Sequence, residues 1–350
     1  MIKLNETPVR TSRNFNINNI KIENLNMPKK VNEFKNYNIT RDSSRDLVDT
    51  NIGNMDVKYG VGLEDYIRNN SNNKIRLNVT TKTSKDIIID YKFDKDNLTL
   101  LENIEIVLEE NTKSTIIIRY DSDKELEAFH SGIIKVIAKN GSNSNIIIVN
   151  LLNKQSNNFL SIDNKIEENA TLKYTVVDFG RKNSITNYYS DLVGDNSNNI
   201  INGIYLGTDN QLIDLNYIGE LRGKKSNINI EIQGALKDNS KKHFKGTIDF
   251  KRGAKKAKGN ENENCMLLSN TARSLALPML LCQEEDVEGN HSTSSGKAGE
   301  KELFYIMSRG FSEKDALKLL VRAKFNSIIE GIKNQEIKNR LIYEIENRLD

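Results

Sequence analysis

Two adjoining stretches decide the fold: the turn Glu109-Glu110-Asn111-Thr112-Lys113-Ser114 and the strand Ile116-Ile117-Ile118-Arg119-Tyr120 that follows it. A polar turn and then an apolar strand recur around Asn140, Asn169 and Asn196, so the turn asparagines are 29, 29 and 27 residues apart. A repeat of this length without helices is typical of a β-solenoid, in which coils of two or three strands stack. Asn and Gly suit the turns because both tolerate positive φ, and Asn side chains could bond to one another along the stack.

The surrounding segment supports a mainly β protein. From about residue 74 to residue 281, short runs rich in Ile, Val, Leu and Thr follow one another without long helical patterns. A doubly wound α/β sheet, which needs a helix after nearly every strand, is therefore disfavoured. A β-sandwich of ordinary strands remains the alternative, although its turn signals should recur about every 8–12 residues.

The chain divides into three stretches: an irregular N-terminal segment (1–73), a β core (74–298) and a C-terminal helical module (299–350). The first stretch is polar and shows no sustained periodicity, apart from a short possible helix around residues 62–67. The last stretch predicts helices that begin near Glu300, after an N-cap at Ser312, and near Asn334. An apolar stripe runs from Leu317 to Leu349, and either the β core or a partner must cover it.

Composition excludes several classes of protein. The charges nearly cancel, with 51 Lys and Arg against 48 Asp and Glu, so nucleic acid is not an expected partner. Apolar runs fall far short of the ~18 residues that span a bilayer, and the first residues have no apolar core of a signal peptide. Cys265 and Cys282 cannot form a disulfide framework. We therefore expect a cytoplasmic protein without a membrane partner.

The sequence lacks the local motifs of common enzymes. We find no phosphate-binding loop, nucleophile elbow, His-Glu-x-x-His pair or Rossmann glycine fingerprint, and we expect no catalytic activity. The acidic residues are expected on the solvated surface, and the basic run at residues 251–258 in a solvated loop. Cys265 and Cys282 are expected to be inert core residues.

Histidine is the remaining candidate for metal chemistry. His130, His243 and His291 are too far apart to predict a metal cage from spacing. His291 lies in a polar stretch before the helical module, where an imidazole could be a metal ligand. Spacing alone favours a hydrogen-bonded loop residue instead.

Four motifs in the stretch from Lys245 to Arg309 resemble the SufB/SufD family of iron–sulfur cluster assembly scaffolds. The last of them extends one residue further, to Gly310. The motifs are Gly246-Thr247-Ile248-Asp249-Phe250-Lys251-Arg252-Gly253, Leu267-Leu268-Ser269-Asn270-Thr271-Ala272-Arg273-Ser274 with Pro278, Glu284-Glu285-Asp286-Val287-Glu288-Gly289-Asn290-His291, and Gly299-Glu300-Lys301-Glu302-Leu303-Phe304-Tyr305-Ile306-Met307-Ser308-Arg309-Gly310. The opening Thr7-Pro8-Val9-Arg10-Thr11 also looks like the start of SufD-type chains. Between these ends only the β-rich character matches.

The resemblance implies a right-handed parallel β-helix flanked by terminal segments. It also implies partners, since family members pair SufB with SufD through their β-helices and dock a SufC-type ABC ATPase on their C-terminal helices. That ATPase would cover the stripe from Leu317 to Leu349 and would supply the ATP chemistry.

Two departures favour the SufD branch. The cluster-assembly cysteine of the SufB branch, six residues before the proline that matches Pro278, is Ala272 here, and the glutamate after the matching histidine is Ser292. In the SufD branch that histidine lies at the SufB interface, so the resemblance implies that His291 helps to hold a transient iron–sulfur cluster. Cys265 and Cys282 match no family site. A homodimeric SufB-like scaffold that works with the ATPase alone is the alternative, and a secreted β-helix lyase is disfavoured.

Overall fold

The computed structural model describes residues 2–11, 17–23, 25–41, 47–53, 55–83, 85–123, 125–179 and 182–350. In this part of the chain, one nine-stranded sheet contains β3 (Tyr37–Thr40), β6 (Ile87–Phe93), β8 (Lys113–Ser122), β10 (Asn143–Leu151), β12 (Thr171–Asp178), β14 (Asn198–Gly207), β16 (Asn227–Leu236), β18 (Ala257–Leu267) and β20 (Val287–Lys297). A second nine-stranded sheet contains β4 (Leu47–Asp49), β5 (Asn73–Val79), β7 (Thr99–Leu108), β9 (Phe129–Ala138), β11 (Asn157–Ile166), β13 (Asn183–Leu192), β15 (Leu212–Leu221), β17 (Lys241–Phe250) and β19 (Arg273–Cys282). The other elements are β1 (Ile2–Leu4), β2 (Ile20–Ile22), α1 (Glu64–Asn70), α2 (Glu300–Ser308), α3 (Glu313–Ile329) and α4 (Gln335–Leu349).

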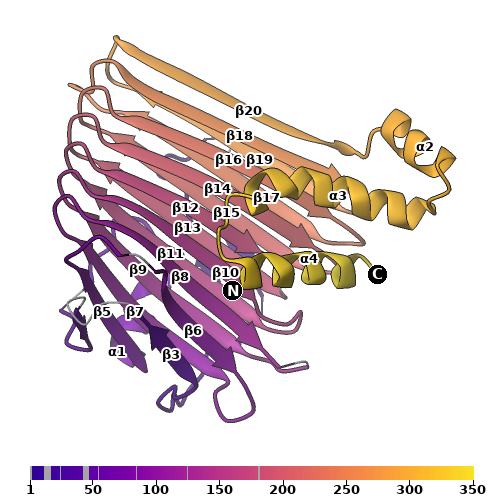
Figure 1. Ribbon diagram of the computed structural model, residues 1–350, viewed down its shortest axis with the longest axis horizontal. Coiled ribbons are helices and arrows are strands. Elements are labelled where there is room, and N and C mark those ends of the chain that lie inside the picture. The colour runs from indigo at the N-terminus through magenta and orange to yellow at the C-terminus, as the bar shows by residue number, and fades with distance from the viewer. Residues whose placement is uncertain are drawn as a thin grey trace.

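The two sheets are the walls of a parallel β-solenoid. From β5 to β20 the chain adds one strand to each sheet in turn, so each coil has two strands (Figure 1). Residues that lie opposite each other in successive coils are 26 to 32 positions apart. One such column contains Lys113, Asn143, Thr171, Asn198, Asn227 and Lys258. The predicted solenoid is confirmed, and the sandwich alternative is wrong.

The turns use the chemistry that the repeat predicted. Asn111, Asn169 and Asn196 have φ values of 57°, 54° and 55°, and in the remaining predicted turn Gly141 takes the left-handed position instead of Asn140. Asn side chains also bond from coil to coil: Asn196 Nδ2 donates to Asn169 Oδ1 at 3.3 Å.

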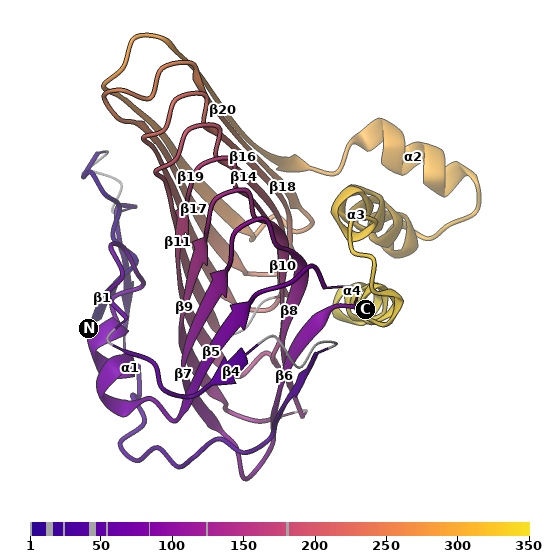
Figure 2. The ribbon, with the colours of Figure 1, turned by 60° about the vertical axis from the view of Figure 1, so that its left-hand side comes forward.

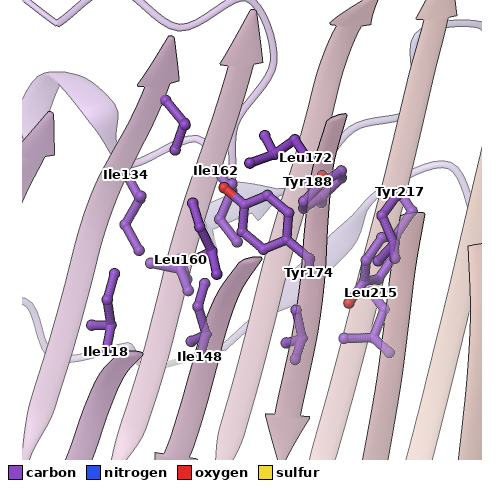
Figure 3. Packing of buried hydrophobic residues seen from close by; sticks show 14 of the residues in the cluster. Ile118, Ile134, Ile148, Leu160, Ile162, Leu172, Tyr174, Tyr188, Leu215 and Tyr217 are labelled. Carbon is purple, nitrogen blue, oxygen red and sulfur yellow. The ribbon is translucent and has the colours of Figure 1, made fainter. Parts of the chain in front are cut away.

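Alternate residues of every coil point inward and stack in columns. Figure 3 shows part of this interior, where isoleucines such as Ile118 and Ile148 pack in the same buried cluster as Tyr174, Tyr188 and Tyr217. The Tyr174 and Tyr188 rings meet edge to face at 5.0 Å between centroids. Each of these side chains contributes ~1.5–3 kcal/mol by burial, so the interior is the main source of stability.

An N-terminal arm, which we define as the described residues up to Asn70, covers the outer face of the β5–β19 sheet (Figure 2). Leu4 and Ile67 of the arm pack with Phe129 and Phe159 of the sheet. The short helix expected near residues 62–67 is α1 (Glu64–Asn70). Strands β3 and β4 pair antiparallel with β6 and β5, so the arm also protects the first coil.

Helices α3 and α4 cover the outer face of the other sheet, the one that ends in β20. Ser312 caps α3 by accepting a hydrogen bond from the Asp315 backbone at 3.1 Å, as its sequence predicted. Phe325 of α3 and Leu341 of α4 are buried against outward-facing residues such as Phe179 and Val149. Because the solenoid itself buries this stripe, the inference that a partner covers it is wrong.

Helix α2 is different, because it has no buried residue. Phe304 is 75% exposed and Tyr305 is 59% exposed, and Met307 and Phe311 are exposed beside them. The helix projects beyond the sheets in both views of the ribbon (Figures 1 and 2). None of the described helices combines the length and the apolar character needed to cross a membrane.

Candidate functional site

The last coil, formed by β19 and β20, is the structural setting of His291. Both strands are outermost in their sheets, so no further coil stacks on them in the described part of the chain. His291 lies in the middle of β20, directly opposite Glu261 of β18. Because opposite residues of parallel strands share a face, the imidazole lies on the inward side of the last coil, yet it is solvent-exposed. The expectation of a loop position is wrong, since the segment is a strand.

The coil below carries two buried carboxylates, Glu261 and Glu263, that face inward from β18. Glu261 is 2% exposed, and neither of its carboxylate oxygens has a hydrogen-bond partner among the described residues. Burial, with a smaller contribution from the charge of Glu263, raises the pKa of Glu261 to about 8. Glycine at position 246 makes room for it, since an added Cβ would lie 2.2 Å from the carboxylate atoms.

Glu263, in contrast, is paired. Lys242 Nζ of β17 lies 2.8 Å from its Oε1, and the Tyr205 hydroxyl donates to the same oxygen at 2.6 Å. Both members of the ion pair are almost completely buried, so each depends on the other for compensation of its charge. Glu263 is two residues after Glu261 on the same buried face of β18, so the pair lies beside Glu261 in the interior.

The two cysteines have different surroundings. Cys265 is buried two residues beyond Glu263, so the predicted core position is confirmed, and burial raises the pKa of its thiol. Cys282 is exposed at the end of β19, and its Sγ contacts the Glu284 carbonyl oxygen at 2.9 Å. The same prediction is wrong for Cys282, because no coil stacks on the strand that carries it.

The structure does not bring the three histidines together. His130 is buried in the first coils, with Nε2 3.0 Å from Glu102 Oε1 and Nδ1 2.6 Å from Asn158 Oδ1. His243 lies on the outer face of β17, 3.3 Å from Asp214. Within the described residues, no three His, Cys, Asp or Glu side chains converge as a metal cage.

Sequence reasoning missed the buried polar groups. It assigned carboxylates to the solvated surface, but Glu102, Asp214, Glu261 and Glu263 are buried. A usable signal was present in β18, where Asn and Glu alternate from Asn260 onward, because one of the two faces of any strand in a solenoid points inward. The basic run does lie in a turn, between β17 and β18, with Arg252 and Lys255 exposed as predicted.

Comparison with known families agrees with the fold and with the motif positions. The model of the SufBD core domain, described as SUF system FeS cluster assembly, matches residues 91–324, which is more than half of the chain. The chain belongs to the SufBD family. The matched region includes most of the solenoid, the β19–β20 coil with His291, and α2.

Individual relatives come from both branches of the family. The chain is 28% identical over 164 residues to the iron–sulfur cluster assembly protein SufD of Bacillus subtilis and 24% identical over 163 residues to SufD of Escherichia coli. It is 33% identical over 171 residues to a SufBD family protein of Pyrococcus horikoshii. These alignments cover 47%, 47% and 48% of the chain, but only 37%, 38% and 37% of the respective relatives. SufB of Bacillus subtilis also matches, at 23% identity over 194 residues.

In this SufBD protein the two branch positions have distinct surroundings. Ala272 is buried in the turn before β19, where its methyl group packs against the interior. Ser292 faces away from the interior, and its hydroxyl donates to Asn262 Oδ1 at 2.8 Å. Neither residue can supply a thiolate or a carboxylate, so of the residues at these matched positions only His291 can bind a metal.

Proposed function

We propose that this chain is a SufD-like, non-catalytic subunit of an iron–sulfur cluster assembly scaffold in the cytoplasm. Membership of the SufBD family carries the proposal. The similarity to SufD proteins, together with Ala272 and Ser292 at the branch positions, supports the branch. The cysteines of the described residues are free thiols, which suits a reducing compartment. In this proposal residues 1–73 brace the solenoid, residues 74–298 are the scaffold and residues 299–350 are the module for a motor subunit.

A SufB-type subunit pairs with the open end of the solenoid. The outer edges of β19 and β20 have no strand beside them in the described structure, and their backbone groups can accept strands from another chain. Nearly every residue of β20 is exposed. A second scaffold chain placed there would cover both edges and the inward-facing side chains of the last coil at once.

A SufC-type ABC ATPase docks on α2. Phe304, Tyr305 and Met307 lie on a helix that the solenoid leaves uncovered, and an exposed aromatic patch of this kind is typical of an interaction surface. The sequence has no phosphate-binding loop, so ATP binding would belong to the other chain. Movement of the ATPase would pass through α3 and α4, which are packed on the outer face of the solenoid.

His291 takes part in building the cluster, which is the substrate of the assembly. Its exposed imidazole faces the proposed SufB interface, and a neutral imidazole is a ligand for iron beside thiolates. The cluster would be transient and shared, with the thiolates supplied by the partner.

The alternative function is a homodimeric SufB-like scaffold that works with the ATPase alone. The similarity of this chain to SufB of Bacillus subtilis supports this alternative. Purification of the tagged chain from its own cytoplasm separates the two. We expect a distinct SufB-type chain and an ABC ATPase in the complex. A complex that contains only this chain and the ATPase would support the alternative.

A further inference from the structure

Glu261 and His291 are neighbours in one interior column at the open end. They lie directly opposite each other on β18 and β20 and share the inward face of the sheet. Only the last coil separates Glu261 from solvent, and the residue of that coil that stacks on Glu261 is His291. Across the interior, Pro278 of β19 stacks on Gly246 and leaves that side without a polar group.

The carboxylate of Glu261 has no structural task within the described chain. A buried carboxyl group without hydrogen bonds costs stability, and such groups are normally paired. Its neighbour Glu263 follows this rule, because it is held by Lys242 and Tyr205. Glu261 is almost completely buried, with 2% of its surface exposed, but it has no such partner among the described residues. The chain therefore keeps a carboxyl group without hydrogen-bond partners inside, one coil below an exposed imidazole.

Strand β17, in the sheet opposite β18, leaves space for the carboxyl group of Glu261. At Gly246 an added Cβ would lie 2.2 Å from Cδ and from both carboxylate oxygens of Glu261. Because Gly246 has no side chain, the Glu261 carboxyl group can occupy the space beside the Gly246 backbone. A larger residue at position 246 would displace the carboxyl group from this space. Nothing in the backbone demands glycine here, because Gly246 is not among the positive-φ residues.

We propose that Glu261 and His291 form a two-ligand site for ferrous iron at the open end of the solenoid. One carboxylate oxygen and one imidazole nitrogen are ligands that Fe²⁺ accepts, with its other positions open to water, sulfide or groups of a partner chain. No third His, Cys, Asp or Glu of the described residues joins them, which suits a site completed by another subunit. The inference rests on the proposed role of His291 and adds a residue that holds iron before sulfide arrives.

The test is an anaerobic titration of the full-length chain, purified alone. Fe²⁺ binding is followed by calorimetry, and Co²⁺ binding by visible absorption. We expect one equivalent of metal, no thiolate charge-transfer band, and at least about tenfold weaker binding in both Glu261→Gln and His291→Ala. Glu288→Gln is the matched control, because Glu288 is on β20 but exposed and paired with Lys258, and it should bind as the wild type does.

Two results would overturn the site. If Glu261→Gln binds like the wild type while His291→Ala loses binding, Glu261 is not a ligand and the proposed role of His291 stands. If the wild-type chain binds neither metal, the proposed site is wrong. Cluster reconstitution on the full complex then tests the proposed role of His291 separately. Gly246→Ala displaces the carboxylate without removing it, so it gives the same answer should Glu261→Gln fail to fold.

Discussion

At the scale of single residues, the carboxyl group of Glu261 makes stability depend on pH. Its pKa in the folded chain is about 8, above the ordinary value of 4.5, because burial disfavours the charged form. Between these two values the folded state holds a proton that the unfolded state releases, so stability falls as pH rises and the loss is complete above the folded pKa.

Glu261→Gln should remove this dependence. Relative to the variant, the wild type should lose about 2 kcal/mol or more of unfolding free energy between pH 5 and pH 8.5. Urea denaturation at both pH values, with a chelator present, measures the difference. Parallel pH profiles for the two proteins would show that Glu261 is not a buried acid with a raised pKa.

The Lys242–Glu263 pair makes a second prediction at this scale. Lys242→Met leaves the Glu263 carboxylate buried without its cation and should cost about 3–5 kcal/mol in the free energy of unfolding. Adding Glu263→Gln should restore a large part of that loss, whereas Lys255→Met in the exposed turn should change little. Additive losses in the double variant would mean that the two groups do not compensate each other.

At the scale of elements, the C-terminal helices comprise a buried structural face on α3 and α4 and the exposed face of α2, which we propose binds the ATPase. Phe325→Ala on α3 removes a buried aromatic and should cost about 3–5 kcal/mol. Phe304→Ser on α2 should change stability by less than about 0.5 kcal/mol and should abolish binding of the ATPase in a pull-down. Tyr343→Ser, at an exposed tyrosine of α4, is the control, and loss of binding in this variant as well would argue against α2 as the specific site.

The same elements show what the sequence could and could not predict. Helical periodicity and the Ser312 cap located α3, but an amphipathic stripe does not say whether a sheet or a partner covers it. The repeat could be recognised in the sequence where Asn fills the left-handed turn positions. It could not be recognised in the later turns, because Lys225, Asp238 and Lys256 fill the same positions there. The motifs singled out His291. They did not single out Glu261, because its inward direction follows only from strand register.

At the scale of the whole molecule, the solenoid has two protected faces and one free end. The arm covers one sheet, α3 and α4 cover the other, and β19 with β20 remains open beside the projecting α2 (Figures 1 and 2). A chain of this shape can join two partners at different places, one at the end and one at α2. In the proposed complex, a movement at α2 would reach the end coil directly, because only Ala298 and Gly299 join α2 to β20.

The most direct measurement is anaerobic reconstitution of the purified complex with iron and sulfide, comparing the wild type with His291→Ala and with Ser292→Ala as the outward-facing control. We expect all three complexes to have the same subunits and mass, and His291→Ala alone to hold several-fold less iron and sulfide per complex. Equal cluster content in His291→Ala and wild type would contradict the role of the open end in cluster assembly.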